Sequence, residues 1–125
     1  MSIQSIFLIL LSVLLSASAQ IMMKAGMSSA AVQHALLSGQ NFPTMILTIA
    51  TSPLVLLGLL SFGFSAFAWL FVLSRIDVGQ AYPFVALGIV VTSIAGHVLF
   101  KEDLDIYRAL GVGTIVIGVI IVGAT

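Results

Sequence analysis

The sequence contains no cysteine and very few charged residues. Without cysteine, the chain cannot form disulfides or thiolate-ligated metal sites. A soluble domain carries roughly 25% charged residues, whereas only 6% of these 125 residues are charged. The four basic and four acidic residues balance, so the net charge does not point to nucleic acid as a partner. Since 61% of the residues are hydrophobic, we expect lipid to be the main solvent of the chain.

Four apolar stretches are long enough to cross a bilayer, whose hydrocarbon core requires about 20 residues of helix. Ser52 and Asp105 are candidate N-caps, and Asp77 with Gln80 resembles a capping box. The sequence therefore predicts an all-α integral membrane protein, with residues 1–125 forming a single domain of four transmembrane helices. The predicted helices cover residues 3–23, 53–73, 79–100 and 106–122, and the charged residues fall in the joints between them.

The stretch between the first two spans fits a membrane crossing less well. Residues 28–37 can form a short helix, and residues 43–50 are apolar but too short to span. One unbroken helix over residues 43–73 would be about 46 Å long, so a break is expected near Pro53. We therefore predict short interfacial helices within residues 28–50, between the first and second transmembrane helices.

The first apolar stretch ends in Ala17-Ser18-Ala19, which also fits the A-x-A pattern of a signal-peptide cleavage site. A signal peptide usually begins with basic residues, and Met1-Ser2-Ile3-Gln4 contains none. We therefore expect the first helix to be retained, with no cleaved signal peptide.

The basic residues give only a weak signal for membrane orientation. Placing Lys24, Lys101 and Arg108 in the cytoplasm leaves only Arg75 outside. This bias favours both termini outside. Because the totals are so small, insertion in both orientations also stays open.

Polar residues recur on one face of the first predicted helix. Ser12, Ser16, Gln20 and Lys24 are four residues apart and form a stripe along it. Polar side chains in lipid usually face the bundle interior or a wet cavity. Serines also serve plain helix packing, because a hydroxyl can bond the carbonyl one turn back. Lys24 can either snorkel to the membrane edge or bind an anion, and these alternatives stay open.

The second and third predicted helices carry fewer polar groups. Ser65 and Trp69 are four residues apart on the second helix. Trp69 is either a core or interfacial aromatic residue or part of a binding surface. Tyr82 and Pro83 open the third helix, where Pro83 permits a bend.

The predicted spans contain no acidic residue, because Asp77, Glu102, Asp103 and Asp105 all belong to the joints. The sequence shows no nucleophile–base pair, metal-ligand cluster or phosphate-binding loop. We therefore expect neither an enzyme nor a cofactor or metal site. A polar stripe without reactive groups suits the binding or passage of a solute.

Four blocks of the sequence, in their order and spacing, carry a resemblance to a known family. They are SASAQIMMKAG, SPLVLLGLL, LSRIDVGQAYPF and FKEDLDIYRALGVGTIVIGVIIV. Together they resemble the small four-helix EamA-like branch of the drug/metabolite transporter superfamily, over nearly the whole chain. The AYP block and the acidic hairpin before a glycine-rich last helix are the most specific parts.

Two groups within that superfamily are similar to this sequence. The small multidrug resistance exporters carry a proton- and drug-binding glutamate eight residues before the lysine that follows the first helix, and Ser16 stands at the matching position here. Subunits of the flippase for aminoarabinose-phospho-undecaprenol lack that glutamate and have a similar S-x-x-x-Q-x-x-x-K pattern. The second resemblance implies a multi-pass protein of the bacterial inner membrane that translocates a polyprenyl-phosphate-linked sugar. The alternatives are an exporter of small molecules or cationic drugs, and a non-transporting membrane subunit.

The resemblance also implies that two small subunits pair, as a homodimer, including an antiparallel one, or as a heterodimer with a similar subunit. The expected partner is a polyprenyl-phosphate sugar lipid or another amphipathic small molecule, in membrane lipid and without nucleic acid. In this hypothesis the polar stripe bonds the sugar, Lys24 with Arg75 holds the carrier phosphate, and aromatic side chains stack on the sugar. The predicted substrate-binding residues are Ser12, Ser16, Gln20, Lys24, Trp69, Arg75 and Tyr82, with Pro83 as a hinge.

Overall fold

Long apolar helices make up most of the chain. The computed structural model describes residues 2–39 and 41–125, and within them it contains helices and no strands. Four helical stretches are long and apolar enough to cross a membrane, which confirms the all-α prediction with four transmembrane helices. They are α1 (Ile3–Met27), α4 (Pro53–Leu73), α6 (Val85–Phe100) with the short helices that precede it, and α7 (Ile106–Gly123).

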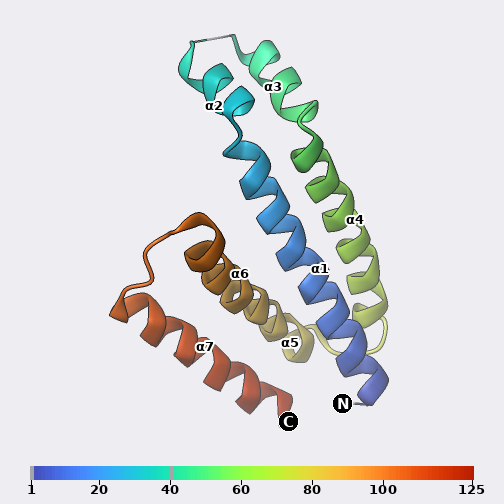
Figure 1. Ribbon diagram of the computed structural model, residues 1–125. Coiled ribbons are helices and arrows are strands. Elements are labelled where there is room, and N and C mark those ends of the chain that lie inside the picture. Colours follow the sequence, from blue (N-terminus) through green and yellow to red (C-terminus); the bar gives the residue numbers. More distant parts are fainter. Residues whose placement is uncertain (1, 40) are drawn as a thin grey trace.

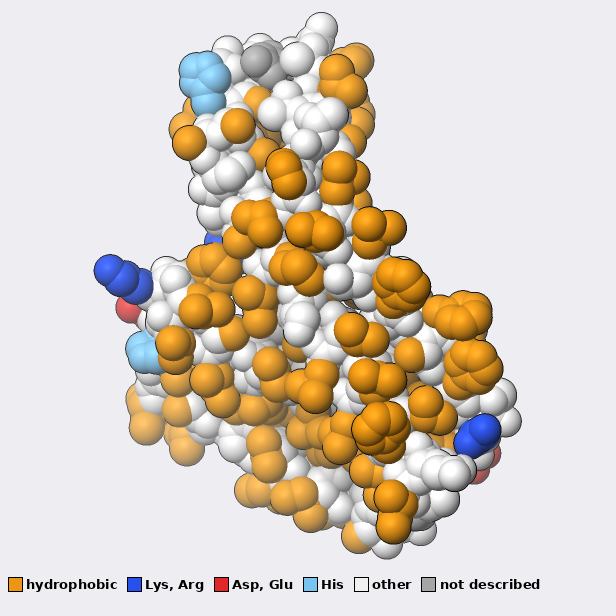
Figure 2. Space-filling model, turned by 45° about the vertical axis from the view of Figure 1, so that its right-hand side comes forward, with side chains coloured by type: hydrophobic (Ala, Val, Ile, Leu, Met, Phe, Trp, Pro, Cys, Tyr) orange, Lys and Arg blue, Asp and Glu red, His pale blue; other side chains and the backbone are white. Residues whose placement is uncertain are grey.

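The antiparallel helices α1 and α4 lie side by side along their length, and α1 also packs against α6 (Figure 1). The last helix, α7, packs against α6 and lies away from the α1–α4 pair (Figure 1). The start of α1 and the end of α7 lie at the same end of the bundle (Figure 1). Figure 2 shows one face of the molecule covered mostly by hydrophobic side chains, with charged groups in only a few spots. This surface is what a lipid solvent requires.

Between α1 and α4 the chain forms two short helices, α2 (Ala30–Leu37) and α3 (Phe42–Ala50). They continue the α1–α4 hairpin past the ends of α6 and α7 (Figure 1). Val32 and Ala35 of α2 are buried, whereas α3 buries no residue and exposes Phe42 and Leu47. The placement of these two helices at the bilayer surface stays a prediction.

The three predicted capping residues all occupy the N-cap position of a helix, but only one of them makes a side-chain capping bond. Asp105 caps α7, because its carboxylate accepts a hydrogen bond from the Arg108 backbone N–H at 2.8 Å. Ser52 occupies the N-cap position of α4 without a side-chain hydrogen bond. Asp77 likewise makes no side-chain capping bond, so the predicted capping box is wrong. At the other end of the first span, α1 continues to Met27, so Lys24 lies in its last turn.

The third span changes its helix type around Pro83. The α-helix α5 (Val78–Ala81) leads into the 3₁₀ turn η1 (Tyr82–Phe84), which leads into α6. The backbone angles of Ala81, Tyr82 and Val85 all stay in the right-handed helical region. Pro83 therefore tightens one turn rather than breaking the helix, and a 3₁₀ turn inside a span is a common place for a hinge. Its action as a hinge stays a prediction.

Small residues let α1 and α4 approach closely. Ala17 and Ala19, which form the A-x-A pattern, are both buried in the fold. A Cβ atom added at Gly26 would lie 2.8 Å from the Val55 backbone nitrogen. This is the packing that membrane helices use in place of a hydrophobic driving force. The pattern that resembles a cleavage site is therefore part of the α1 packing surface.

Replacing Gly58 with alanine is expected to lower the melting temperature of the detergent-solubilised protein. The added Cβ would lie 2.5 Å from Met23 Cγ and 3.0 Å from the Ala19 carbonyl oxygen, and such overpacking typically costs about 1–3 kcal/mol. Gly63→Ala in the same helix is the matched control, because nothing lies within 4 Å of its added Cβ. Equal melting temperatures for the two variants would contradict the close α1–α4 contact.

Candidate functional site

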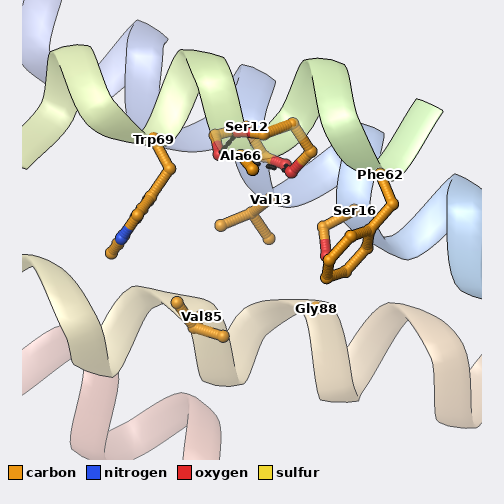
Figure 3. Close-up of a pocket in the computed structure, with 9 residues that line it drawn as sticks. Ser12, Val13, Ser16, Phe62, Ala66, Trp69, Val85 and Gly88 are labelled. Atoms are coloured by element: carbon orange, nitrogen blue, oxygen red, sulfur yellow. Dashed lines mark hydrogen bonds between the residues drawn. The ribbon is translucent and has the colours of Figure 1, made fainter. Parts of the chain in front are cut away.

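Three adjoining cavities run along the contact between α1 and α6. The first has a volume of about 180 Å³ and also touches α4 (Figure 3). The second, about 290 Å³, shares Ser16 and Gly88 with the first. The third, about 220 Å³, shares Gln20 and Thr92 with the second. We call this series the α1–α6 groove, and its polar or charged lining residues are Ser12, Ser16, Gln20, Lys24, Ser65, Thr92 and Glu102.

The deep end of the groove is apolar, although two serines lie beside it. The Ser12 hydroxyl donates to the Ser65 carbonyl at 3.0 Å, and the Ser65 hydroxyl donates to the Ser12 carbonyl at 2.8 Å. Both residues are buried. Each hydroxyl proton therefore joins α1 to α4 and is not directed to a solute. Ser12 therefore helps to pack α1 against α4, and its hydrogen bond to a sugar stays a prediction.

Aromatic side chains from α4 bound this deep end. Trp69 and Phe62 extend from α4 toward α6, and Val85 and Gly88 face them from α6 (Figure 3). Trp69 is half-buried and lines this end of the groove, and its role in binding stays a prediction. Gly88 leaves space there, because its absent side chain would extend toward Val13.

Three polar side chains line the middle of the groove. Ser16 is half-buried and lines both the first and the second cavity. Gln20 lies one turn further along α1 and lines the second and third cavities. Thr92 faces both residues from α6, and its hydroxyl donates to the Ile89 carbonyl at 3.1 Å. Sequence reasoning missed Thr92, although Gly88, Thr92 and Gly96 at four-residue spacing mark a small-residue face of α6.

An ion pair closes the rim of the groove at the C-terminal end of α1. The Lys24 ammonium lies 4.0 Å from the Glu102 carboxylate, and the two side chains are 53% and 48% exposed. Both residues line the third cavity. Glu102 was predicted only as part of a joint, because the sequence does not show that the loop after α6 returns to α1.

Arg75 and Tyr82 lie away from this rim. Val72, three residues before Arg75, belongs to the same buried cluster as Ile9 of α1. Lys24 is 15 residues beyond Ile9, which is roughly 22 Å along the helix axis. Within one chain, Lys24 and Arg75 therefore cannot hold the same phosphate, which corrects the predicted pairing for a single chain. Between two paired subunits the pairing stays a prediction. Tyr82 is 63% exposed at the Arg75 end and is not among the residues that line the groove.

The structure thus brings five of the seven predicted binding residues together along the groove: Ser12, Ser16, Gln20, Lys24 and Trp69. Within residues 2–39 and 41–125, the groove holds its charges only at the rim and shows no cluster of metal-ligating side chains. Such a site can hold a solute by hydrogen bonds and one ion pair.

Comparisons with known proteins identify relatives among membrane transport proteins. Relatives in the curated set are probable 4-amino-4-deoxy-L-arabinose-phosphoundecaprenol flippase subunits ArnE. The subunit from Pseudomonas savastanoi pv. phaseolicola is 36% identical over 84 residues, covering 67% of this chain and 73% of that protein. The one from Aeromonas hydrophila subsp. hydrophila is 26% identical over 118 residues, covering 94% and 96%.

A third such relative, from Pseudomonas aeruginosa, is 39% identical over 72 residues, which is 58% of this chain. The match spans 63% of that relative, slightly less than two thirds of its length. No solved structure matches this chain significantly. The model of the EamA-like transporter family matches residues 3–124. Because this match spans nearly the whole chain, the protein belongs to the EamA-like transporter family.

Proposed function

We propose that this protein is a subunit of a flippase that moves a polyprenyl-phosphate-linked sugar across the membrane. The α1–α6 groove is the observation that carries the proposal, because its lining changes from polar at the Lys24 rim to apolar beside Trp69. The names of the relatives supply the substrate class. The spans hold no carboxylate, so they lack the group with which a proton-coupled exporter would bind an organic cation.

In this proposal each part of the lipid has its own place. The carrier phosphate binds the Lys24 ammonium at the membrane edge, where a cation is well tolerated. The sugar hydroxyls bond to Gln20, Ser16 and Thr92 below the rim. The polyprenyl chain stays in the bilayer and leaves the groove sideways between the helices. The 3₁₀ turn at Pro83 lets α6 tilt against α1 as the headgroup advances.

The polar lining of one chain covers only part of the membrane thickness. Lys24 and Ser16 are eight residues apart, which is about 12 Å along α1, whereas the hydrocarbon core is about 30 Å thick. A second small subunit in the opposite orientation would provide a polar lining from the other side, as inverted repeats do in larger transporters. Pairing is therefore part of the proposal.

The test measures flipping directly. Liposomes are prepared with undecaprenyl phosphate carrying 4-amino-4-deoxy-L-arabinose, with and without the purified protein and any subunit that it retains. A membrane-impermeant amine reagent then labels the sugar amine on the outer leaflet. We expect the protein to bring the inner-leaflet lipid within reach of the reagent, whereas protein-free liposomes are labelled only on the outside. Equal labelling in both preparations would contradict transport by this protein and favour a non-transporting role.

A further inference from the structure

The Lys24–Glu102 pair raises a question that phosphate binding alone does not answer. The Glu102 carboxylate, 4.0 Å from the Lys24 ammonium, competes with a phosphate for that ammonium. Its negative charge also repels the phosphate. Both side chains are about half exposed, and an ion pair in such a position contributes little to stability. The carboxylate therefore weakens the rim as a site for a purely anionic headgroup without a compensating gain in the fold.

The backbone around Glu102 holds this carboxylate at the rim. The Glu102 N–H donates to the Gly96 carbonyl at 3.2 Å, and the Glu102 carbonyl lies 2.9 Å from His97 Nδ1. Lys101 ends α6 in a left-handed conformation, with a positive φ of 54°. A Cβ atom at Gly96 would collide with Glu102 Oε1, so the glycine makes room for the carboxylate. Its position is thus set by the loop and not by Lys24 alone.

The opposite charges at the rim match a headgroup that carries both charges itself. We propose that Lys24 binds the phosphate and Glu102 binds an ammonium of the same lipid headgroup, so that Glu102 selects aminosugar lipids over neutral sugar lipids. The internal ion pair is exchanged for two charge-assisted pairs with the ligand, so neither charge at the rim loses a partner. This inference rests on the proposed function and deepens it.

The third cavity has the shape for such an exchange. Gln20 and Thr92 line it between the two charged residues and the second cavity, where they can bond the ring hydroxyls of a sugar. Lys24 and Glu102 stand at its exposed edge, so both side chains can part without disturbing buried packing. A further cavity of about 480 Å³, between α6 and α7, shares Thr92 and Glu102 with the third cavity. It is also lined by Asp103 and by Arg108, whose guanidinium donates to the Asp103 carbonyl at 2.8 Å.

Some bulk phospholipids share this chemistry. Phosphatidylethanolamine also carries a phosphate and an ammonium, but it has no sugar ring to bond with Gln20 and Thr92. The binding experiment therefore uses three lipids in phosphatidylglycerol nanodiscs that contain the protein and any subunit it retains. They are undecaprenyl phosphate carrying 4-amino-4-deoxy-L-arabinose, the same lipid carrying L-arabinose, and phosphatidylethanolamine.

We expect the wild-type protein to bind the aminosugar lipid about tenfold or more tightly than either of the other two lipids. Glu102→Gln is expected to abolish the preference over the arabinose lipid and to leave the affinity for the arabinose lipid, whose only charge is its phosphate, unchanged or higher. Asp103→Asn is the matched control, because Asp103 does not line the third cavity, and it should keep the full preference. Glu102→Asp retains the charge on a shorter stem and should keep part of it.

Each other result has a definite meaning. A wild-type preference retained in Glu102→Gln overturns the selecting role of Glu102. Equal wild-type affinity for the two sugar lipids overturns the inference and leaves the proposed function in place. Wild-type protein that binds neither sugar lipid overturns both. Phosphatidylethanolamine bound as tightly as the aminosugar lipid assigns the rim to bulk phospholipid, which overturns selection of a sugar.

Discussion

Replacing Lys24 with alanine is expected to slow flipping of the aminosugar lipid by about tenfold or more. Lys24 is the cation on the rim of the α1–α6 groove, and a charge-assisted bond to a phosphate is worth about 1.5–3 kcal/mol. Its pair with Glu102 is half exposed and contributes about 0–1 kcal/mol to stability. Insertion and melting temperature should therefore stay close to those of the wild type, while the amine-labelling assay shows slow transfer.

Two controls separate phosphate binding from a general loss of positive charge. Lys101→Ala removes a lysine at the same end of the bundle that does not line the groove, and it should flip lipid at the wild-type rate. Arg75→Ala should leave the affinity for the lipid at the Lys24 rim unchanged, because Arg75 lies at the opposite end. A wild-type rate for Lys24→Ala, or an equal loss in Lys101→Ala, would show that the phosphate binds elsewhere.

The membrane spans and the α1 side of the groove could be predicted from the sequence, because both follow from the requirements of a helix in a bilayer. Hydrocarbon demands a minimum length and an apolar composition, which four stretches of this sequence meet. Four-residue spacing then places Ser16, Gln20 and Lys24 on one side of a helix, and the structure aligns them along the groove. Even the separation of Lys24 from Arg75 follows from topology, since one follows the first span and the other the second.

Other features depend on which helices meet and how the loops turn. The partner of Ser12 is Ser65, 53 residues away, so its packing role appears only once α1 and α4 are placed together. Glu102 reaches the rim because Lys101 adopts a left-handed conformation. A lysine rarely adopts this conformation, so the sequence does not predict it. Thr92 lies on a helix with few polar residues. Only its position opposite Gln20 in the structure identifies it as a residue of the groove.

Replacing Gly88 with leucine is expected to stop flipping while lipid still binds at the rim. Gly88 lines the first two cavities, and its added Cβ would lie 3.6 Å from Val13 Cγ1, an ordinary contact distance. The backbone thus accepts a side chain, and the rest of the leucine fills space beyond Ser16. Labelling of the inner-leaflet lipid should fall to the level of protein-free liposomes, and lipid affinity in nanodiscs should be retained.

Side chains of different size at position 88 distinguish a blocked path from a damaged fold. Gly88→Ala adds only the Cβ and should flip lipid nearly as well as the wild type, whereas Gly88→Leu should not. Gly113→Leu adds the same bulk to α7, where nothing lies within 4 Å of the added Cβ, and should be active. Equal losses in the alanine and leucine variants would mean that α1 and α6 no longer pack correctly. Full activity of Gly88→Leu would mean that the headgroup crosses by another route, and the α1–α6 groove would then serve only for binding at the rim.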